Sequence, residues 1–243
     1  MRLPLAEVPT LRQLYRLGKL APADPAALRY KHAGNLLDRV SLYQGTITAL
    51  EVDAIVNAAN RSLLGGGGVD GAIHAAAGRK LLAECRTLHG CATGDAKITK
   101  GYDLPAKHII HTVGPVYSSE DSEYCADLLA SCYRRSMEIA AAKSLKHIAF
   151  PSISTGVYGY PVEDATHVAL DEVRNFLTSE TGSQIERVIF VVWSDHDKEI
   201  YEDILPLYYP LDELKTDTAS PEVKDEIKQE IKDEAEDETV SRE

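Results

Sequence analysis

The repeated alternation of short apolar runs with segments of helical periodicity limits most strongly what this chain can fold into. The apolar runs are rich in β-branched residues and typical of buried strands; they span residues 40–43, 54–58, 107–113, 147–153 and 187–193. Helices are predicted over residues 70–88, about 122–143, 161–177 and about 197–207. Strands that alternate with helices form a layered α/β domain with a largely parallel sheet. Ligands bind such sheets beyond the carboxyl ends of the strands, so the residues after 58, 153 and 193 are the first candidates for a site.

The two ends of the chain differ from this middle part. Residues 1–40 contain two short amphipathic patterns, at 11–17 and 25–37, which predict a helical extension packed on a domain of residues 41–210. Residues 211–243 include 13 acidic and 5 basic residues, so this segment carries −8 of the net charge of −12. A segment this charged and without aromatic residues cannot bury enough apolar surface to offset its ordering entropy. We therefore expect a disordered acidic tail at 211–243.

Composition argues against several classes of protein. No apolar run approaches the roughly 18 residues of a membrane span, and the N-terminus lacks the apolar stretch of a secretory signal. These features predict an intracellular protein, nuclear or cytoplasmic, without membrane contact. The nearly neutral body has no basic stripe, which argues against duplex nucleic acid as a partner. The four cysteines form no CxxC pair and are expected to be reduced thiols. We expect a monomer that uses no cofactor.

Four consecutive glycines, residues 65–68, follow the second predicted strand and lead into a helix. Glycine lets backbone N–H groups approach a ligand closely, and a helix N-terminus favours anions. The run Gly66-x-Gly68-x-x-Gly71 also fits the dinucleotide-binding pattern. That interpretation is rejected because residues 60–64 separate the strand from the glycines, and Glu84, at the spacing of the ribose-binding acid, falls inside the predicted helix. A P-loop is excluded because no Gly-Lys-Ser/Thr follows.

A second loop, residues 152–161, lies between a predicted strand and a predicted helix and combines hydroxyl groups and glycines with tyrosines. Both loops follow strand ends, so together they are suited to grip the two sides of a diphosphate. This combination is far more specific than either loop alone.

Four motifs together resemble the macrodomain family. They are Val56-Asn57-Ala58-Ala59-Asn60, the glycine loop at 65–70, His111-Thr112-Val113-Gly114-Pro115 and Ser154-Thr155-Gly156-Val157-Tyr158-Gly159. The motifs occur in the family's order over roughly residues 40–205, and the match is closest to the MacroD-type mono-ADP-ribosyl hydrolases. The resemblance implies a three-layer α/β/α sandwich with a mixed, largely parallel central sheet. It also implies that ADP-ribose binds in a cleft across the top of the sheet.

Matching positions suggest roles for individual residues. Asp70 corresponds to the family's catalytic acid, and Asn60 to the amide that contacts the distal ribose. His74 lies four residues after Asp70 on the same helical face and corresponds to its partner in a dyad. A helix N-terminus favours negative charge, so Asp70 is expected to stay ionised and to orient a water molecule; helix capping is the alternative role.

The resemblance also implies a set of ADP-ribose-binding residues. They are Thr46, Ile47, Asn57, Gly67, Gly68, Val69, Ser154, Thr155, Gly156, Val157, Tyr158 and Trp193. Tyr158 matches the aromatic residue that packs against the distal ribose, and Trp193 the one that stacks on adenine. Asn57 is expected to hold the loop by hydrogen bonds.

Thr46 departs from the family pattern. The family usually has Gly-Asp-Ile where this chain has Gly45-Thr46-Ile47, and that Asp accepts a hydrogen bond from the adenine amino group. A hydroxyl accepts such a bond without charge. A charge-assisted bond contributes about 1.5–3 kcal/mol and a neutral one about 0.5–1.5, so we expect roughly tenfold weaker affinity.

The activity implied by the resemblance is removal of mono-ADP-ribose from acidic side chains of modified proteins, together with deacetylation of O-acetyl-ADP-ribose. Either Asp70 or the ligand's own diphosphate activates the water. Two alternatives stay open. One is a non-catalytic reader of ADP-ribosylated proteins, which Thr46 favours. The other is a phosphatase acting on ADP-ribose 1″-phosphate.

Three further groups of residues contain histidine, cysteine or lysine side chains that can carry a function. His111 lies inside an apolar strand and is predicted to be a core histidine. Cys85, His89 and Cys91 provide only three potential zinc ligands near a helix end, so no metal site is predicted. The tail repeats an apolar-Lys-x-Glu pattern at Lys224, Lys228 and Lys232, which is typical of SUMO conjugation; a solvated, partly helical charged tract is the alternative.

Overall fold

The structure is a computed structural model, and it describes residues 2–211. The predicted tail disorder beyond Leu211 and the predicted SUMO sites at Lys224, Lys228 and Lys232 lie outside the described residues. Within the described part of the chain, no helix is long and apolar enough to cross a membrane.

Six strands form the central sheet, in the order β2-β8-β7-β4-β6-β5. Neighbouring strands are parallel except for the edge strand β5, which runs antiparallel to β6. The strands are β2 (Val40–Gln44), β4 (Ala54–Ala58), β5 (Ala96–Lys100), β6 (His108–Thr112), β7 (His147–Pro151) and β8 (Arg187–Val192). A separate two-stranded parallel sheet joins β1 (Leu3–Pro4) to β3 (Leu50–Glu51). The expectation of a mixed, largely parallel sheet is confirmed.

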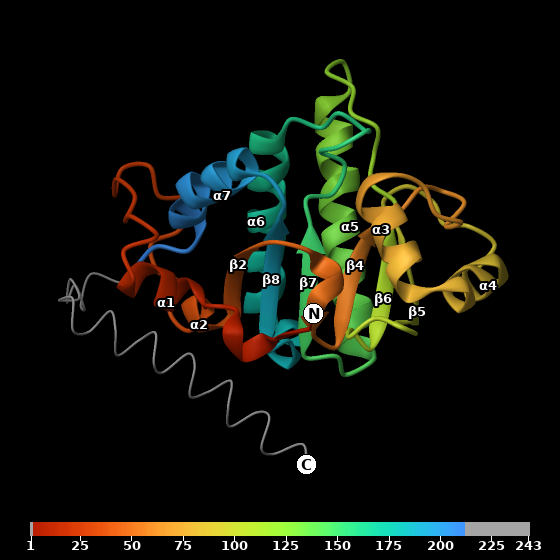
Figure 1. Ribbon diagram of the computed structural model, residues 1–243. Helices are drawn as coiled ribbons and strands as arrows, with labels where there is room; N and C mark the ends of the chain where they lie inside the picture. The colour runs from red at the N-terminus through yellow and green to blue at the C-terminus, as the bar shows by residue number, and fades with distance from the viewer. Residues whose placement is uncertain (1, 212–243) are drawn as a thin grey trace, which may run out of the picture.

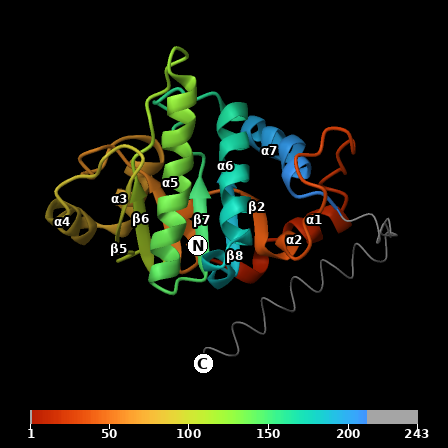
Figure 2. The same cartoon turned by 180° about the vertical axis from the view of Figure 1, so that it is seen from behind.

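Helices cover both faces of the sheet. They are α1 (Leu11–Arg16), α2 (Leu36–Arg39), α3 (Gly68–Ala77), α4 (Arg79–Thr87), α5 (Ser122–Ala142), α6 (Val162–Thr178) and α7 (Asp195–Tyr208), with 3-10 turns η1 (Leu5–Glu7), η2 (Ile47–Ala49) and η3 (Thr181–Gln184). Helices α5 and α6 lie behind the sheet in Figure 1 and in front of it in Figure 2, whereas α3 lies on the opposite face.

The alternation of side chains along the strands produces two apolar cores, one on each face. On β7, Phe150 packs into the core that contains Met137 of α5 and Val173 of α6. Its neighbour Ala149 belongs to the other core, which contains Ile73 of α3. The sheet is therefore the middle of three layers, and both of its faces are buried.

The N-terminal segment is tied to the end of the domain. Leu11 and Tyr15 of α1 are buried in the same core as α7, and the Tyr15 hydroxyl donates a hydrogen bond of 3.0 Å to the backbone oxygen of Tyr209. A capping box formed by Thr10 and Gln13 defines the start of α1. The first predicted helix of the extension is thereby found, at Leu11–Arg16.

Three details of the predicted elements are wrong. The expected helix at 25–37 is mostly turns and irregular backbone, with only α2 near its end. The expected helix at 70–88 is two helices, because Gly78 adopts a left-handed backbone (φ 79°) and a Cβ there would lie 2.5 Å from a carboxylate oxygen of Asp103. Strand β5 was not expected, because an edge strand with two lysines lacks the apolar run that marks a buried strand.

Candidate active site

A cleft of about 750 Å³ opens beyond the carboxyl ends of the central strands. These strand ends lie at the top of the sheet in Figure 1. Four loop regions line it: residues 45–48 after β2, 58–60 and 66–70 after β4, 151–158 after β7 and 191–193 after β8. The parallel arrangement brings these separate loops to one edge of the sheet. The cleft thus lies where the strand pattern predicts a ligand site.

The glycine loop presents an open helix N-terminus to the cleft. Helix α3 begins at Gly68, its N-cap is Gly67, and no side chain caps it. Gly68 has a left-handed backbone (φ 59°), which favours glycine. The first N–H groups of α3 therefore have no side-chain acceptor, which makes this helix end suited to an anion such as a diphosphate.

Gly66 separates two polar side chains of the cleft. A Cβ at this position would lie 3.1 Å from Oδ2 of Asp70 and 3.3 Å from Nδ2 of Asn60. The absence of a side chain at Gly66 therefore keeps space beside both groups. It also shows that Asp70 Oδ2 and Asn60 Nδ2 face the same point of the loop.

Asn60 stabilises the entry to the glycine loop. Its Nδ2 donates to the backbone oxygen of Gly65 at 2.9 Å, and its Oδ1 accepts from the backbone N–H and the hydroxyl of Ser62, at 3.0 and 2.6 Å. One hydrogen on Nδ2 is left to donate to a ligand. Asn60 thus combines a structural role in the loop with a place in the cleft wall.

The second loop is shaped by a close contact with the segment after β6. Ser154 is buried and has a left-handed backbone (φ 67°), and a Cβ at Gly114 would come within 2.1 Å of its hydroxyl oxygen. Only glycine fits at 114. Tyr158 is held in turn, because its backbone oxygen accepts a hydrogen bond of 2.9 Å from Tyr117. Val157, which precedes Tyr158 in this loop, has a side chain that is 95% exposed.

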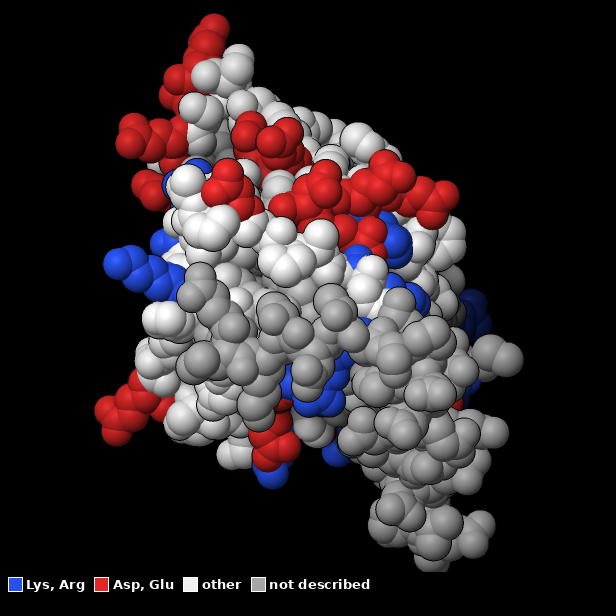
Figure 3. Space-filling view, turned by 90° about the vertical axis from the view of Figure 1, so that its left-hand side faces the viewer, with Lys and Arg blue, Asp and Glu red and all other residues white. Residues whose placement is uncertain are grey.

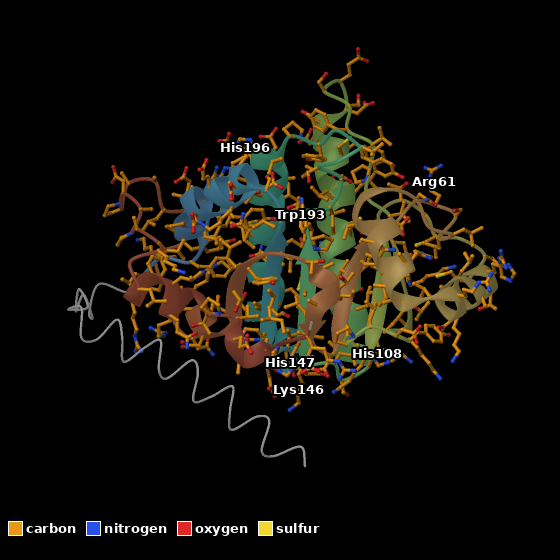
Figure 4. The ribbon with its side chains drawn as sticks, in the orientation of Figure 1. Arg61, His108, Lys146, His147, Trp193 and His196 are labelled. Atoms are coloured by element: carbon orange, nitrogen blue, oxygen red, sulfur yellow. The ribbon has the colours of Figure 1, made fainter. Side chains whose placement is uncertain are left out.

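Thr46, Ile47 and Trp193 line the part of the cleft that follows strands β2 and β8. The hydroxyls of Thr46 and Thr48 lie 3.1 Å apart, and Trp193 is 76% exposed, so its ring is free to stack on a planar ligand. Figure 4 places Trp193 and His196 at the upper end of the sheet.

Sequence reasoning missed Asp197, which also lines the cleft at this end. Ser194 accepts a hydrogen bond of 3.0 Å from the backbone N–H of Asp197 and caps α7. A Ser followed by three acidic or polar residues after a buried strand was the available signal. Figure 3 shows acidic side chains gathered on the upper part of the face that includes α7, whose first turn holds Asp195 and Asp197.

Comparisons with known proteins agree with this geometry. Residues 56–169 match the family model described as Macro domain. A macro domain-containing protein of Chlorobaculum tepidum is 61% identical over 159 residues, which cover 65% of this chain and 91% of that protein. The chain belongs to the macrodomain family.

Longer relatives and solved macrodomains are also similar. The ADP-ribose glycohydrolase MACROD2 of Xenopus laevis is 50% identical over 208 residues, covering 86% of this macrodomain chain but 49% of that protein. The chain therefore spans about half the length of that curated relative. The crystal structure of a Trypanosoma brucei macrodomain in complex with ADP-ribose has a TM-score of 0.66 and 44% identity, over 77% of this chain and 75% of the other.

The predicted acid Asp70 lies in the first turn of α3, in the wall of the macrodomain cleft. It is only 3% exposed, and its Oδ1 accepts a hydrogen bond of 2.7 Å from Nδ2 of Asn57. The imidazole Nε2 of His74 lies 3.5 Å from the same oxygen. Asp70 is not the helix cap, because the N-cap is Gly67.

Asn57 and His74 were predicted at the site but do not line the macrodomain cleft. Asn57 is fully buried in β4, behind Asp70, so it contacts the carboxylate rather than the cleft or the loop. His74 is one helical turn below Asp70 and is 13% exposed. The other predicted residues, Thr46, Ile47, Asn60, Gly67, Gly68, Val69, Asp70, Ser154, Thr155, Gly156, Val157, Tyr158 and Trp193, all line the cleft.

His111 is fully buried, as predicted for a core histidine, but it is connected to the site. Its Nδ1 lies 3.0 Å from Nδ2 of Asn57 and its Nε2 lies 2.9 Å from the Thr99 hydroxyl. Burial, followed by the nearby His74, lowers the pKa of His111 to about 3. The thiol of Cys85 packs against the same ring, 3.8 Å from Nε2, instead of near His89 or Cys91, and all four cysteines are free in the structure.

Proposed function

We propose that this macrodomain binds ADP-ribose in the cleft and hydrolyses the ester that attaches mono-ADP-ribose to Asp or Glu side chains of modified proteins. The relatives MACROD1 and MACROD2 carry the name ADP-ribose glycohydrolase, and the Trypanosoma brucei macrodomain was crystallised with ADP-ribose. The glycine loop and the second loop support binding of the diphosphate, and Trp193 supports stacking on the adenine.

The observation that carries the proposal is the orientation of Asp70. Its Oδ1 is fixed by Asn57, while its Oδ2 faces the space beside Gly66, next to Asn60 Nδ2. A general base needs one oxygen within hydrogen-bond reach of the attacking water. A buried carboxylate anchored at one oxygen and open at the other meets this requirement. A carboxylate that only caps a helix does not need an oxygen that faces the cleft.

The reaction is a displacement at C1″ of the distal ribose. The water oxygen bonds to C1″ while the bond from C1″ to the ester oxygen breaks, and the modified side chain leaves as a carboxylate. A proton of the water passes to Asp70 or to the ligand diphosphate. Asn60 holds the ribose hydroxyls and Tyr158 limits the pose of the sugar, so that C1″ faces the water. We propose deacetylation of O-acetyl-ADP-ribose as a second activity of the same site.

Replacement of Asp70 by alanine tests the proposal. The wild-type chain is expected to release ADP-ribose from glutamate-modified protein, whereas Asp70→Ala loses most of this activity, about 100-fold or more, and still binds ADP-ribose. Asp195→Ala is the matched control, because this exposed acid also begins a helix near the cleft but does not line it. Free ADP-ribose is measured by chromatography, and binding by calorimetry. Release by Asp70→Ala at the wild-type rate would show that Asp70 is not the base.

The same assay separates the proposed activity from its alternatives. A reader binds ADP-ribose without releasing it from modified protein. A phosphatase releases phosphate from ADP-ribose 1″-phosphate and leaves the modified protein intact. No heat and no saturation with millimolar ADP-ribose would overturn all three.

A further inference from the structure

A buried polar cluster lies behind Asp70, and none of its side chains lines the cleft. Asn57, Thr99 and His111 are each at most 2% exposed. Asn57 and His111 are paired in register on the adjacent parallel strands β4 and β6. Buried polar groups are costly unless they are hydrogen-bonded. The side-chain oxygen of Asn57 has no hydrogen-bond partner, so this amide is held through its nitrogen alone.

The hydrogen bonds fix the orientation of the Asn57 amide. A carboxylate oxygen only accepts, so the group of Asn57 that lies 2.7 Å from Asp70 Oδ1 must be its NH₂. That nitrogen also lies 3.0 Å from Nδ1 of His111. Its two hydrogens therefore point to Asp70 and to His111.

The same reasoning fixes the tautomer of His111. Nδ1 accepts a hydrogen from Asn57 and must be unprotonated, so the ring hydrogen is on Nε2, which donates to the Thr99 hydroxyl at 2.9 Å. A proton on Nδ1 would face the N–H of Asn57 and break this chain of bonds. The low pKa of His111, caused mainly by burial, keeps the ring neutral in mildly acidic and neutral solution.

The tautomer also argues against a metal-binding role for the His111 ring. Potential metal-ligand atoms of His74, Cys85 and His111 lie within 4.8 Å of one another. With Nδ1 accepting from Asn57 and Nε2 carrying a hydrogen, however, neither nitrogen of His111 has a free lone pair for a metal ion. The cluster is better explained as a support for Asp70 than as a metal site.

We propose that His111 is a positioning residue for hydrolysis: through the Asn57 amide it holds Oδ1 of Asp70 in place and leaves Oδ2 facing the cleft. Without an acceptor at Nδ1, the Asn57 amide loses one of the two bonds that fix its plane. Asp70 then samples orientations in which Oδ2 does not reach the water. This inference rests on the proposed hydrolase activity.

Two substitutions at His111 distinguish positioning from packing. In His111→Asn, the amide oxygen lies close to the position of Nδ1 and keeps an acceptor for Asn57, although the ring is lost. His111→Leu retains more apolar volume but has no acceptor. If the ring only fills space, leucine is the better replacement; if it positions Asp70, asparagine is. His108→Leu, at the other end of the same strand, is the matched control.

Single-turnover hydrolysis of glutamate-modified protein and calorimetric binding of ADP-ribose provide the readouts. We expect His111→Leu to lower the rate constant about 10- to 100-fold, with the Kd for ADP-ribose changed by less than about twofold, because the ring does not line the cleft. His111→Asn is expected to recover most of the rate, and His108→Leu to keep it. A slower rate for His111→Asn than for His111→Leu, or equal losses in both, overturns the inference.

A measurement on the wild-type chain tests the inference even if the variants do not fold. Long-range ¹⁵N–¹H NMR spectra of the His111 ring are expected to show the neutral form with hydrogen on Nε2, unchanged from pH 8 to pH 5. Hydrogen on Nδ1, or a ring that titrates in this range, overturns the inference even if no variant is soluble. If the wild-type chain releases no ADP-ribose, the proposed function fails, and the ring tautomer still reports whether His111 accepts from Asn57.

Discussion

The two ends of the central sheet each bury an aspartate, and the two carboxylates differ in how many hydrogen bonds they accept. Asp53 lies at the amino end, where its Oδ2 accepts from the backbone N–H groups of Lys146 and His147, at 2.9 and 3.1 Å. Its Oδ1 accepts from Nζ of Lys107 at 2.8 Å, and Nδ1 of His147 lies 3.2 Å from Oδ2. Asp70, at the carboxyl end, accepts a single side-chain hydrogen bond, from Asn57.

This difference reflects what each carboxylate does. Asp53 directly precedes β4, and its partners lie at the starts of β6 and β7, so one side chain fixes the amino ends of three strands; Figure 4 shows Lys146, His147 and His108 together at that end. Asp70 keeps an oxygen facing the cleft. Burial alone therefore does not identify a reactive carboxylate. The unused hydrogen-bonding capacity of Asp70 is what distinguishes it from Asp53, and it is the reason for proposing Asp70 as the base.

The surface shows the same contrast. The large apolar side chains that are exposed in the described part of the chain are Leu64, Val116, Tyr124, Val157 and Trp193. They lie on the loops that follow β4, β6, β7 and β8, or in the first turn of α5 after the β6 loop. The carboxyl end of the sheet thus carries apolar surface exposed for contact, while the amino end is closed by ion pairs.

Removal of the Asp53 side chain is expected to have the largest effect on stability. We expect Asp53→Ala to lower the free energy of unfolding by about 3 kcal/mol, because two partly buried backbone N–H groups lose their acceptor, while any hydrolysis by the folded protein is retained. Urea denaturation followed by circular dichroism measures the change. Glu186→Ala is the control: it removes an exposed ion pair with Lys146 and should cost less than about 1 kcal/mol. Equal losses in the two variants would show that the Asp53 network does not hold the strand ends.

Adding a methyl group at Gly66 tests the opposite end. The backbone there accepts alanine, but the new Cβ would press on Asp70 Oδ2 and Asn60 Nδ2. We expect Gly66→Ala to lower the rate of hydrolysis about 100-fold and to change the free energy of unfolding by less than about 1 kcal/mol. Gly67→Ala sharpens the test, because a Cβ there meets no atom within 4 Å. Gly67→Ala should weaken binding of the diphosphate but leave the rate of hydrolysis in the bound complex unchanged. A large loss of stability in Gly66→Ala, or an unchanged rate, contradicts this assignment.

Acid titration gives a smaller effect with a defined sign. Hydrogen bonding to His147, and then to Lys107 and the Lys146 backbone, lowers the pKa of Asp53 well below its usual value, although burial acts in the opposite direction. A depressed pKa stabilises the fold fully above the unfolded value of about 3.9, and this stabilisation is lost as the pH falls further.

The effect of Asp53 is isolated by a variant that does not titrate. Between about pH 4 and pH 2, the wild-type free energy of unfolding should fall more steeply than that of Asp53→Asn. Urea denaturation at constant ionic strength over this range measures both slopes. Parallel slopes would mean that Asp53 has the same pKa in the folded and unfolded chains.

Most of the architecture and of the cleft wall was predictable, because the signals that carry them are local. An apolar run without alternation marks a buried strand wherever its neighbours lie, and the run at 54–58 matches β4 at both ends. Glycines at 65–68 before a helix indicate an anion site without reference to the rest of the chain. The helix break at Gly78 was not predicted, because the residue that leaves no room for a side chain there, Asp103, is 25 positions away in the sequence.

The alternation of strands and helices, the family, and the residue types at the strand ends could be inferred from the sequence, since each depends on a short segment. The folded chain was needed to show that Asn57 turns away from the cleft, and that His111, 54 positions further along, is linked to Asp70 through Asn57. That link depends on the order of the strands and on the register that places Asn57 beside His111. Strand order and register are set by the packing of helices on both faces of the whole sheet, and no spacing within one segment encodes them.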